Sequence, residues 1–389
     1  MKKYVLFLFI LITNSALAGY HQTLPKGVRN ITFRLIKTNT IKGSYNASGR
    51  PEGYSINTKI NADVLIGINS TVDAYLQGLP ANDYNEFNFG TFEGKATSDV
   101  FAQAIGAGYG FTNKLTGYAF IPFYNATVDL NLVRTQKGQK NVGTSIALEG
   151  LPEIDVRIIQ NLFVNYYKYQ PLGKWEATGF GDLEFGVLWN FYTFNKGGAL
   201  LNFGGVAPTG REDNPDILQD ISFGDGQWDN FVELGGDYQL SDDFGIDLWS
   251  RYTIQHPFSK ITRLPDSAEF PITASKGQSR IDLGDKLLLG TQGNYRLDDE
   301  WSTSLNYLFE YKDGDDYKSS SAIADQINAN NTQVRAHTAR VGVSFSTLNL
   351  FKKKRFAAPI NINLFIQSVF AGKNTPKYER ADLEFRLYF

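Results

Sequence analysis

Charged residues recur at every second position within several apolar stretches of the chain, and they are its main candidates for a function. Glu184 and Arg386, for example, each stand between two apolar residues. With this spacing the charged side chains share one face of a β-strand and the apolar side chains share the other. Acids and bases on one face can select solutes by charge and size where that face lines an aqueous lumen. The sequence therefore predicts a mixed-charge lumen lined by Glu184, Asp237, Arg251, Lys286, Glu310, Arg340 and Arg386.

Groups that could carry covalent catalysis are sparse. Cysteine is absent and the chain has 3 histidines. The nearest nucleophile–base pair is His256 with Ser250 or Ser259, and no recognisable motif surrounds it. His337 and Ser344 are seven residues apart, which is about 23 Å along a strand. The sequence therefore predicts that the protein is not an enzyme.

Clustered aspartates have a conformational explanation. Asp242-Asp243 and Asp298-Asp299 fall in short connections between apolar stretches, where aspartate is favoured because its side chain bonds to the turn backbone. The run Asp313-Gly314-Asp315-Asp316 offers weak oxygen ligands for Ca²⁺ in a loop, but its spacing is not that of an EF-hand. We therefore expect no metal site and no cofactor.

The elements that must position the lumen side chains are clearest at the C-terminus. In residues 380–389 apolar and polar side chains alternate, with Leu383, Phe385, Leu387 and Phe389 on one face and Asp382, Glu384, Arg386 and Tyr388 on the other. A strand of this kind separates two different solvents. In an outer-membrane barrel the apolar face contacts lipid and the polar face lines the lumen.

The N-terminus has the features of a secretory signal peptide at residues 1–18. Lys2 and Lys3 precede the apolar run Tyr4–Ile12, and Ala16-Leu17-Ala18 supplies a small-residue cleavage site. Beyond it no apolar stretch approaches the twenty residues of a transmembrane helix. The formal net charge of −2 offers no basic surface, so we expect no nucleic-acid partner. Residues 19–389 are expected to form one outer-membrane β-barrel.

Apolar–polar runs joined by short turns indicate β-hairpins. Five are expected: 100–111 with 115–132, 183–193 with 199–207, 231–240 with 244–254, 281–297 with 301–311, and 335–348 with 359–370. With a first strand at 31–36 and the closing strand they make about 12 strands, and an even number places both termini in the periplasm. The remaining connections are long, as extracellular loops are.

Two insertions have helical spacing instead. Apolar residues step by three and four over 64–76 and again over 152–168. We therefore expect short helices in the long extracellular loops. Residues 54–62 and 64–76 could alternatively form an extra hairpin, which would make 14 strands.

Several short motifs resemble one family of outer-membrane proteins. They are the leader Leu24–Gly27, the hairpin Gly108–Thr116, the strand end Gly204–Gly210 and the segment Phe223–Asp229. In these motifs the chain is similar to the MetA-pathway phenol-degradation outer-membrane proteins, which are distant relatives in architecture of the FadL and toluene-transporter barrels. The resemblance implies a pore for small, often hydrophobic or aromatic compounds.

Two further features concern loops and partners. Pro208-Thr209-Gly210 is interpreted first as the end of a strand and the start of an outer loop, because proline cannot donate to the ladder and glycine permits the turn. Direct contact of this loop motif with solute is the second interpretation. The terminal Phe389 resembles the closing residue of bacterial outer-membrane barrels, which implies recognition by the barrel-assembly machinery.

The sequence thus predicts a channel in the outer membrane of a Gram-negative bacterium. It would take up small solutes passively, hydrophobic or aromatic ones among them, through a mixed-charge lumen. Its other expected partners are membrane lipid and lipopolysaccharide. The alternative is a plugged structural barrel at the cell surface whose extracellular loops bind a partner.

Overall fold

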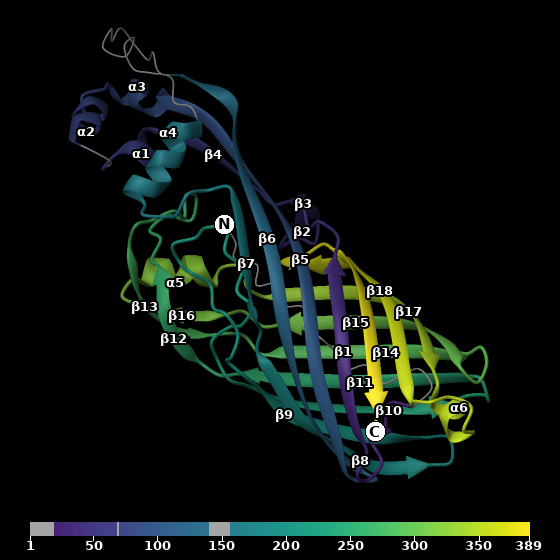
Figure 1. Cartoon of the computed structure of the whole chain (residues 1–389). Coiled ribbons are helices and arrows are strands. Elements are labelled where there is room, and N and C mark those ends of the chain that lie inside the picture. The colour runs from purple at the N-terminus through teal and green to yellow at the C-terminus, as the bar shows by residue number, and fades with distance from the viewer. Residues whose placement is uncertain (1–18, 68–69, 140–155) are drawn as a thin grey trace.

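The first and last strands of the chain lie side by side in a closed barrel (Figure 1). The computed structural model describes residues 19–67, 70–139 and 156–389, so the expected signal peptide at 1–18 lies outside the described residues. Strand β1 (Arg29–Thr38) pairs antiparallel with β20 (Glu379–Tyr388), and Arg34 stands opposite Glu384. This is the pairing that a barrel closed by its C-terminal strand requires.

Twelve of the described strands form the barrel. After β1 and β20, the order around the wall is β18 (Ile360–Lys373), β17 (Val334–Ser346), β15 (Trp301–Lys312), β14 (Lys286–Arg296), β11 (Phe244–Gln255), β10 (Asp229–Gln239), β9 (Gly197–Ala207), β8 (Leu183–Phe194), β6 (Leu115–Gln139) and β5 (Asn88–Thr112). Strand β5 pairs with both β6 and β1 and so closes the ring. The expected antiparallel barrel of about 12 strands is confirmed.

The barrel strands turn alternate side chains outward and inward. Leu248, Leu305 and Ile366 face outward and are each more than 60% exposed. Arg340 and Asp382 face inward and are 1% and 0% exposed. An outward apolar band and a polar interior are what a strand needs when lipid lies on one side and the lumen on the other.

Short turns join the strands at the end of the barrel where β1 begins and β20 ends. The turn after β14 is held by Asp298, whose side chain accepts hydrogen bonds from the backbone N–H groups of Glu300 (2.8 Å) and Trp301 (2.7 Å). This agrees with the conformational explanation of the paired aspartates. Exposed aromatic rings lie near the same end on β8, β10, β14 and β15: Trp189, Tyr192, Tyr238, Tyr295 and Trp301. Aromatic girdles mark both membrane–water interfaces, and the short turns identify this end as the periplasmic one.

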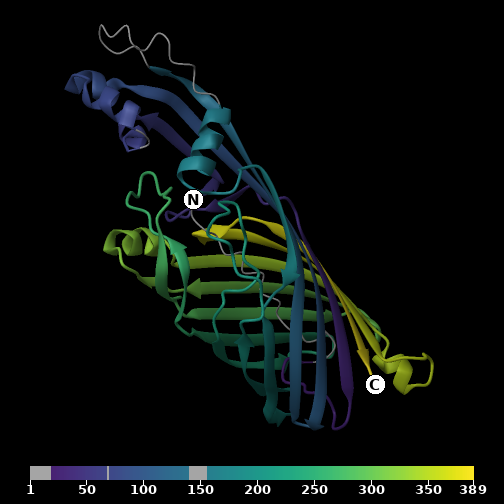
Figure 2. The ribbon, with the colours of Figure 1, turned by 60° about the vertical axis from the view of Figure 1, so that its left-hand side comes forward.

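Strands β5 and β6 have 25 residues each, far more than the roughly 9–11 that cross a membrane. Their surplus length continues beyond the barrel on the extracellular side and forms an arm (Figures 1 and 2). In the arm, β4 (Ser55–Asn61) pairs with β5 and β7 (Lys174–Phe180) pairs with β6. These two strands lie outside the barrel, so the alternative of fourteen barrel strands is wrong.

Helices cover the arm and give it a hydrophobic core. They are α1 (Ala62–Leu65), α2 (Ser70–Gln77), α3 (Ala81–Glu86), α4 (Val156–Asn161) and the π-helical turn Leu162–Tyr166. Leu65, Leu76, Phe87 and Phe163 are buried together there. Short helices thus occur in both expected stretches, but 64–76 is not one helix: α1 ends at Leu65 and Ile66 is extended. Residues 68–69 and 152–155 lie outside the described part.

The other extracellular loops contain small elements. One sheet is formed by β12 (Phe258–Arg263), β13 (Lys276–Asp282) and β16 (Asp316–Lys318), and another by β2 (Gly43–Tyr45), β3 (Pro51–Gly53) and β19 (Thr375–Pro376). Helix α5 (Ala322–Ala329) follows β16, whereas α6 (Leu348–Lys352) lies in the longest periplasmic turn. Within the described ranges no helix is long and apolar enough to span a bilayer.

The strand predicted at 281–297 is wrong in its bounds. The continuous strand expected at 281–297 is two strands, β13 and β14, and they belong to different sheets. The chain breaks at Gly284, where a Cβ atom would lie 2.2 Å from the carbonyl oxygen of Asp313. The close approach of the two backbones admits only glycine there, and it redirects the chain from the loop sheet into the barrel.

Candidate functional site in the barrel lumen

The barrel interior contains the residues that the alternation assigned to a lumen. Arg251, Lys286, Arg340 and Arg386 are buried there, and Glu184, Asp237 and Glu310 are partly buried. Each comes from a different strand, in the order β11, β14, β17, β20, β8, β10 and β15. They do not form one site, because the strands distribute them over several clusters around the wall.

One cluster is centred on Arg251. Its Nη2 donates to Glu184 Oε2 at 2.9 Å, and its Nη1 lies 3.9 Å from Glu233 Oε2. The guanidinium also stacks over Phe231 at 3.6 Å from the ring centre. Tyr118 adds a hydrogen bond to Glu184 at 3.0 Å. One guanidinium is therefore shared by two carboxylates on neighbouring parts of the wall.

The leader, defined as residues 19–28, enters the lumen from the periplasmic end. Tyr20 is buried, stacks on Trp249 at 5.4 Å between ring centres, and donates to Glu233 Oε1 at 2.6 Å. The backbone N–H of His21 donates to Asp237 Oδ1 at 2.9 Å, and the His21 ring lies 2.5 Å from the same oxygen. The leader thus crosses the mouth of the barrel and is fastened to β10 and β11.

The opposite wall is rich in arginine. Asp382 Oδ2 accepts from Arg34 Nη2 at 2.6 Å, and Asp382 Oδ1 accepts from Arg380 Nε at 2.8 Å. Arg340 Nη2 lies 3.6 Å from the same carboxylate. Beside them Arg386 and Glu384 form a pair at 3.0 Å. Three guanidinium groups therefore surround one buried carboxylate.

Charge is unevenly distributed around the lumen. The neighbouring strands β17, β18, β20 and β1 turn inward four guanidiniums and two carboxylates, a formal excess of two positive charges: Arg34, Arg340, Arg380, Arg386, Asp382 and Glu384. Strands β8 to β11 turn inward five carboxylates and one guanidinium, an excess of four negative charges: Glu184, Asp229, Glu233, Asp237, Asp247 and Arg251. A solute in the lumen would lie in a transverse electric field.

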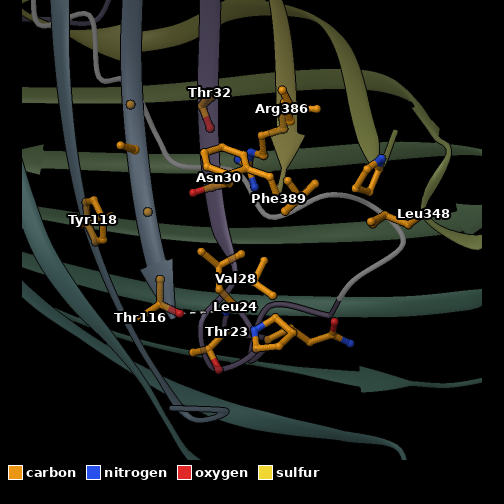
Figure 3. A pocket seen from close by; sticks show the side chains of 18 of the residues that line it. Thr23, Leu24, Val28, Asn30, Thr32, Thr116, Tyr118, Leu348, Arg386 and Phe389 are labelled. Carbon is orange, nitrogen blue, oxygen red and sulfur yellow. Dashed lines mark hydrogen bonds between the residues drawn. The ribbon is translucent and has the colours of Figure 1, made fainter. Parts of the chain in front are cut away.

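A cavity of about 790 Å³ opens at the periplasmic end, and we call it the vestibule (Figure 3). Its walls are largely apolar and include Leu24 and Val28 of the leader, Phe120 of β6 and Phe389 at the chain end. Thr116 fixes the leader wall, because its hydroxyl accepts a hydrogen bond from the Leu24 N–H at 2.8 Å. Arg34, Glu384 and Arg386 also line the vestibule, so it borders the arginine-rich wall.

At the extracellular end, Arg263 holds loops together. Its guanidinium donates to the carbonyls of Tyr167 (2.7 Å), Thr273 (2.8 Å) and Pro215 (3.0 Å), and to Asp216 Oδ1 at 2.6 Å. Burial alone would raise the pKa of Asp216. Hydrogen bonds from Lys276 and the charge of Arg263 outweigh burial and lower that pKa.

The loop motif Pro208-Thr209-Gly210 lies where β7 and β8 are separated by Gly181 and Asp182. The Thr209 hydroxyl accepts from the Leu183 N–H at 2.9 Å and donates to the Gly181 carbonyl at 3.1 Å. The Gly210 N–H donates to Asp182 Oδ1 at 2.8 Å. The motif therefore ends β9 and satisfies backbone groups at an interruption of the neighbouring strand.

The side chains considered for covalent or metal chemistry have other partners. His256 Nε2 lies 2.6 Å from Asn230 Oδ1, and His337 Nδ1 lies 2.7 Å from the Tyr307 hydroxyl. Asp315 is bound by the ammonium group of Lys312. Among the described residues no group of three acids and histidines is placed to hold a metal ion.

Sequence reasoning missed Tyr20, Arg34 and Arg380 as lumen residues. Arg34 and Arg380 could have been found, because each occupies the polar phase of an alternating strand. Tyr20 could not, since it stands in a leader without periodicity.

Solved structures with a similar fold include outer-membrane channels. The COG4313 outer membrane channel from Pseudomonas putida F1 is 14% identical, with a TM-score of 0.55, over 96% of this chain and 99% of that one. The P. putida toluene transporter TodX (11%, TM-score 0.34, 94% and 90%) and the CymD monoaromatic hydrocarbon channel (9%, TM-score 0.33, 94% and 88%) align too weakly to carry an argument. No family model matches the chain, and no curated protein matches its sequence. The first likeness confirms the outer-membrane β-barrel fold that the sequence predicted.

Proposed function

We propose that the protein is an outer-membrane channel through which small solutes enter passively. The observation that carries the proposal is the charge-lined interior of a closed barrel, with an acidic wall on β8 to β11 facing a basic wall on β17 to β1. A barrel that served only as a scaffold could fill its interior with apolar side chains at lower electrostatic cost, because buried charges must be paired or hydrated. Charged walls are the means by which pores select solutes.

In this conformation each end of the barrel carries a non-covalent fastening. The leader is bound to β10 at the periplasmic mouth, and Arg263 joins loops at the extracellular end. Neither contact is covalent, and the leader is held by a small number of side-chain bonds. We propose that transport requires displacement of the leader, which would connect the vestibule with the acidic wall on β8 to β11.

The solute class in this proposal combines two features. The vestibule offers apolar walls of the kind that bind hydrophobic or aromatic compounds, and the arginine-rich wall borders it. Glu184, Asp237, Arg251, Lys286, Glu310, Arg340 and Arg386 are proposed to line the route and to select by charge and size.

Planar-bilayer recording with the purified barrel tests the proposal. We expect discrete conductance steps, and in liposomes an influx of a small solute that stops increasing when the gradient is dissipated. No conductance and no flux, from wild-type protein and from a variant with a loosened leader, would refute it.

A second candidate function is favoured by the arm. An extracellular projection with its own hydrophobic core, built on two 25-residue strands, is larger than a pore requires. In this alternative the lumen stays plugged and the loops bind a partner at the cell surface. It predicts silent bilayers and saturable binding to the cell surface that is lost when the insertion at 135–178 is trimmed.

A further inference from the structure

We propose that the vestibule and the arginine-rich wall beside it form a binding site for a small organic anion. Its apolar body would lie against the vestibule walls and its carboxylate would point toward the guanidinium groups. The inference deepens the proposed channel function, because it names the class of solute. Binding can nevertheless be tested without transport, so the two can fail separately.

The charge of the arginine-rich wall favours an anion. Arg34, Arg340 and Arg380 are all at most 3% exposed, and the carboxylate they surround is that of Asp382. Together with the neutral pair of Arg386 and Glu384, the wall keeps a formal excess of two positive charges. Buried charge of one sign is costly unless a counter-ion compensates it. An anion entering from the vestibule would supply that compensation.

The guanidinium of Arg340 has an edge without a hydrogen-bond acceptor among the described residues. Its Nη2 is 3.6 Å from Asp382, beyond hydrogen-bond distance, and no described residue accepts a hydrogen bond from its Nε or Nη2. The guanidinium is oriented by its contact with Phe365, 3.6 Å from the ring centre. The planar edge formed by these two nitrogens is the edge that binds a carboxylate through two parallel hydrogen bonds.

The vestibule lies directly beside the arginine cluster. Arg34 lines the vestibule and also donates to the carboxylate beside Arg340, so the cavity and the cluster share a residue. Arg386 lines the vestibule as well. A ligand whose apolar part contacts Val28 and Phe120 would therefore have its charged end near the basic wall. A neutral ligand of the same shape would gain only the apolar contacts.

A structural role for the cluster makes the opposite predictions. If the arginines only brace the barrel, Arg340 should stabilise the fold and organic anions should not be preferred over neutral analogues. If they form an anion site, Arg340 adds uncompensated charge to the empty barrel. Its removal should then weaken anion binding without lowering stability.

The test is calorimetric titration of the complete mature barrel in a non-ionic detergent with benzoate and with its neutral isostere benzamide. We expect the wild-type protein to bind benzoate more tightly than benzamide, and Arg340→Gln to weaken benzoate binding on the order of ten- to a hundredfold. Arg335→Gln is the matched control: Arg335 is on the same strand but exposed and stacked on Tyr311, so benzoate affinity should not change.

Two results would overturn the inference: equal affinity for benzoate and benzamide, or unchanged benzoate affinity in Arg340→Gln. If Arg340→Gln does not fold, the affinities of the wild-type protein for benzoate and benzamide still show whether the site prefers the anion. Chloride should then compete with benzoate and weaken its binding, and it should leave benzamide binding unchanged. Benzoate binding by a barrel that does not conduct would refute the channel and leave the anion site standing. Conductance without a preference for benzoate would refute the anion site alone.

Discussion

Replacing Asp382 by asparagine would show how the arginine-rich wall is held together. Asp382 is fully buried and accepts hydrogen bonds from Arg34 at 2.6 Å and from Arg380 at 2.8 and 2.9 Å. Arg340 lies 3.6 Å away. Asparagine keeps the size and shape of the side chain but removes the negative charge that the three guanidiniums share. The formal excess of the wall would rise from two positive charges to three.

The magnitude follows from the burial and the distances. Removing one partner of a buried ion pair costs about 3–5 kcal/mol, because the remaining charge is left without compensation in a poorly solvated place. Arg34 and Arg380 donate short, charge-assisted hydrogen bonds to Asp382, and the Asp382 side chain has no exposed surface. We therefore expect Asp382→Asn to lower the free energy of unfolding by about 3–5 kcal/mol.

The assay is denaturant titration of the barrel in lipid vesicles, followed by tryptophan fluorescence and by the mobility of the folded barrel in gels. Asp299→Asn is the control, because Asp299 pairs with Lys353 in an exposed periplasmic turn and should contribute nothing measurable. If Asp382→Asn were no less stable than Asp299→Asn, the interior would be hydrated enough to screen the charges. The reasoning about a buried, charge-paired wall would then be wrong.

Three further predictions concern the leader, the loops and the lipid face. Tyr20→Ala removes the stacking on Trp249 and the bond to Glu233, and we expect bilayer recordings to show a higher open probability, by about tenfold or more; an open probability equal to that of the wild type would contradict the role of the leader. The lowered pKa of Asp216 means that its contribution to loop stability is present above the ordinary carboxyl pKa near 4 and is lost as the pH falls below it. The amide hydrogen-exchange rate of residues 264–275, corrected for the intrinsic rate, should therefore rise below about pH 4 in the wild type. In Asp216→Asn this rate should no longer depend on pH; a pH profile equal to that of the wild type would contradict the role of Asp216. Leu305→Arg places a charge on the lipid face and should cost about 2–4 kcal/mol in vesicle titrations, whereas Leu305→Phe should be close to neutral; equal stability of the two variants would place Leu305 outside the hydrocarbon.

The alternation of side chains made most of the barrel predictable. Period two assigned Leu383 to the outside and Arg340 to the inside from the sequence alone, because lipid and lumen demand opposite side chains. It also predicted the hairpins, and closure of the barrel requires the pairing of 380–389 with the first strand that the structure has. Turn composition predicted the short periplasmic connections, as the capping role of Asp298 shows.

Other features were beyond a one-dimensional pattern. The outer part of β5, residues 88–99, was not recognised as strand because no lipid contacts it, so the regular apolar–polar contrast is missing. The break at Gly284 depends on a backbone more than twenty residues away in the chain. The cluster of Arg34, Arg340 and Asp382 depends on the register of strands from both ends of the chain.

The position of the leader could not be predicted from a periodic pattern either. Its ten residues from Gly19 to Val28 have no repeat, and a short segment of that kind is ordinarily an exposed terminus. What fixes it in the lumen is the complementarity of Tyr20 and His21 to Trp249, Glu233 and Asp237. These contacts exist only once the barrel has formed.

Single-channel recording of the purified barrel beside Tyr20→Ala measures the central claim most directly. The channel account predicts brief conductance steps from the wild-type protein and longer openings of the same size from the variant, because the lumen is unchanged and only the leader is loosened. Silence from both proteins, with folded barrels inserted in the same membranes, would contradict the existence of a solute pathway through this lumen.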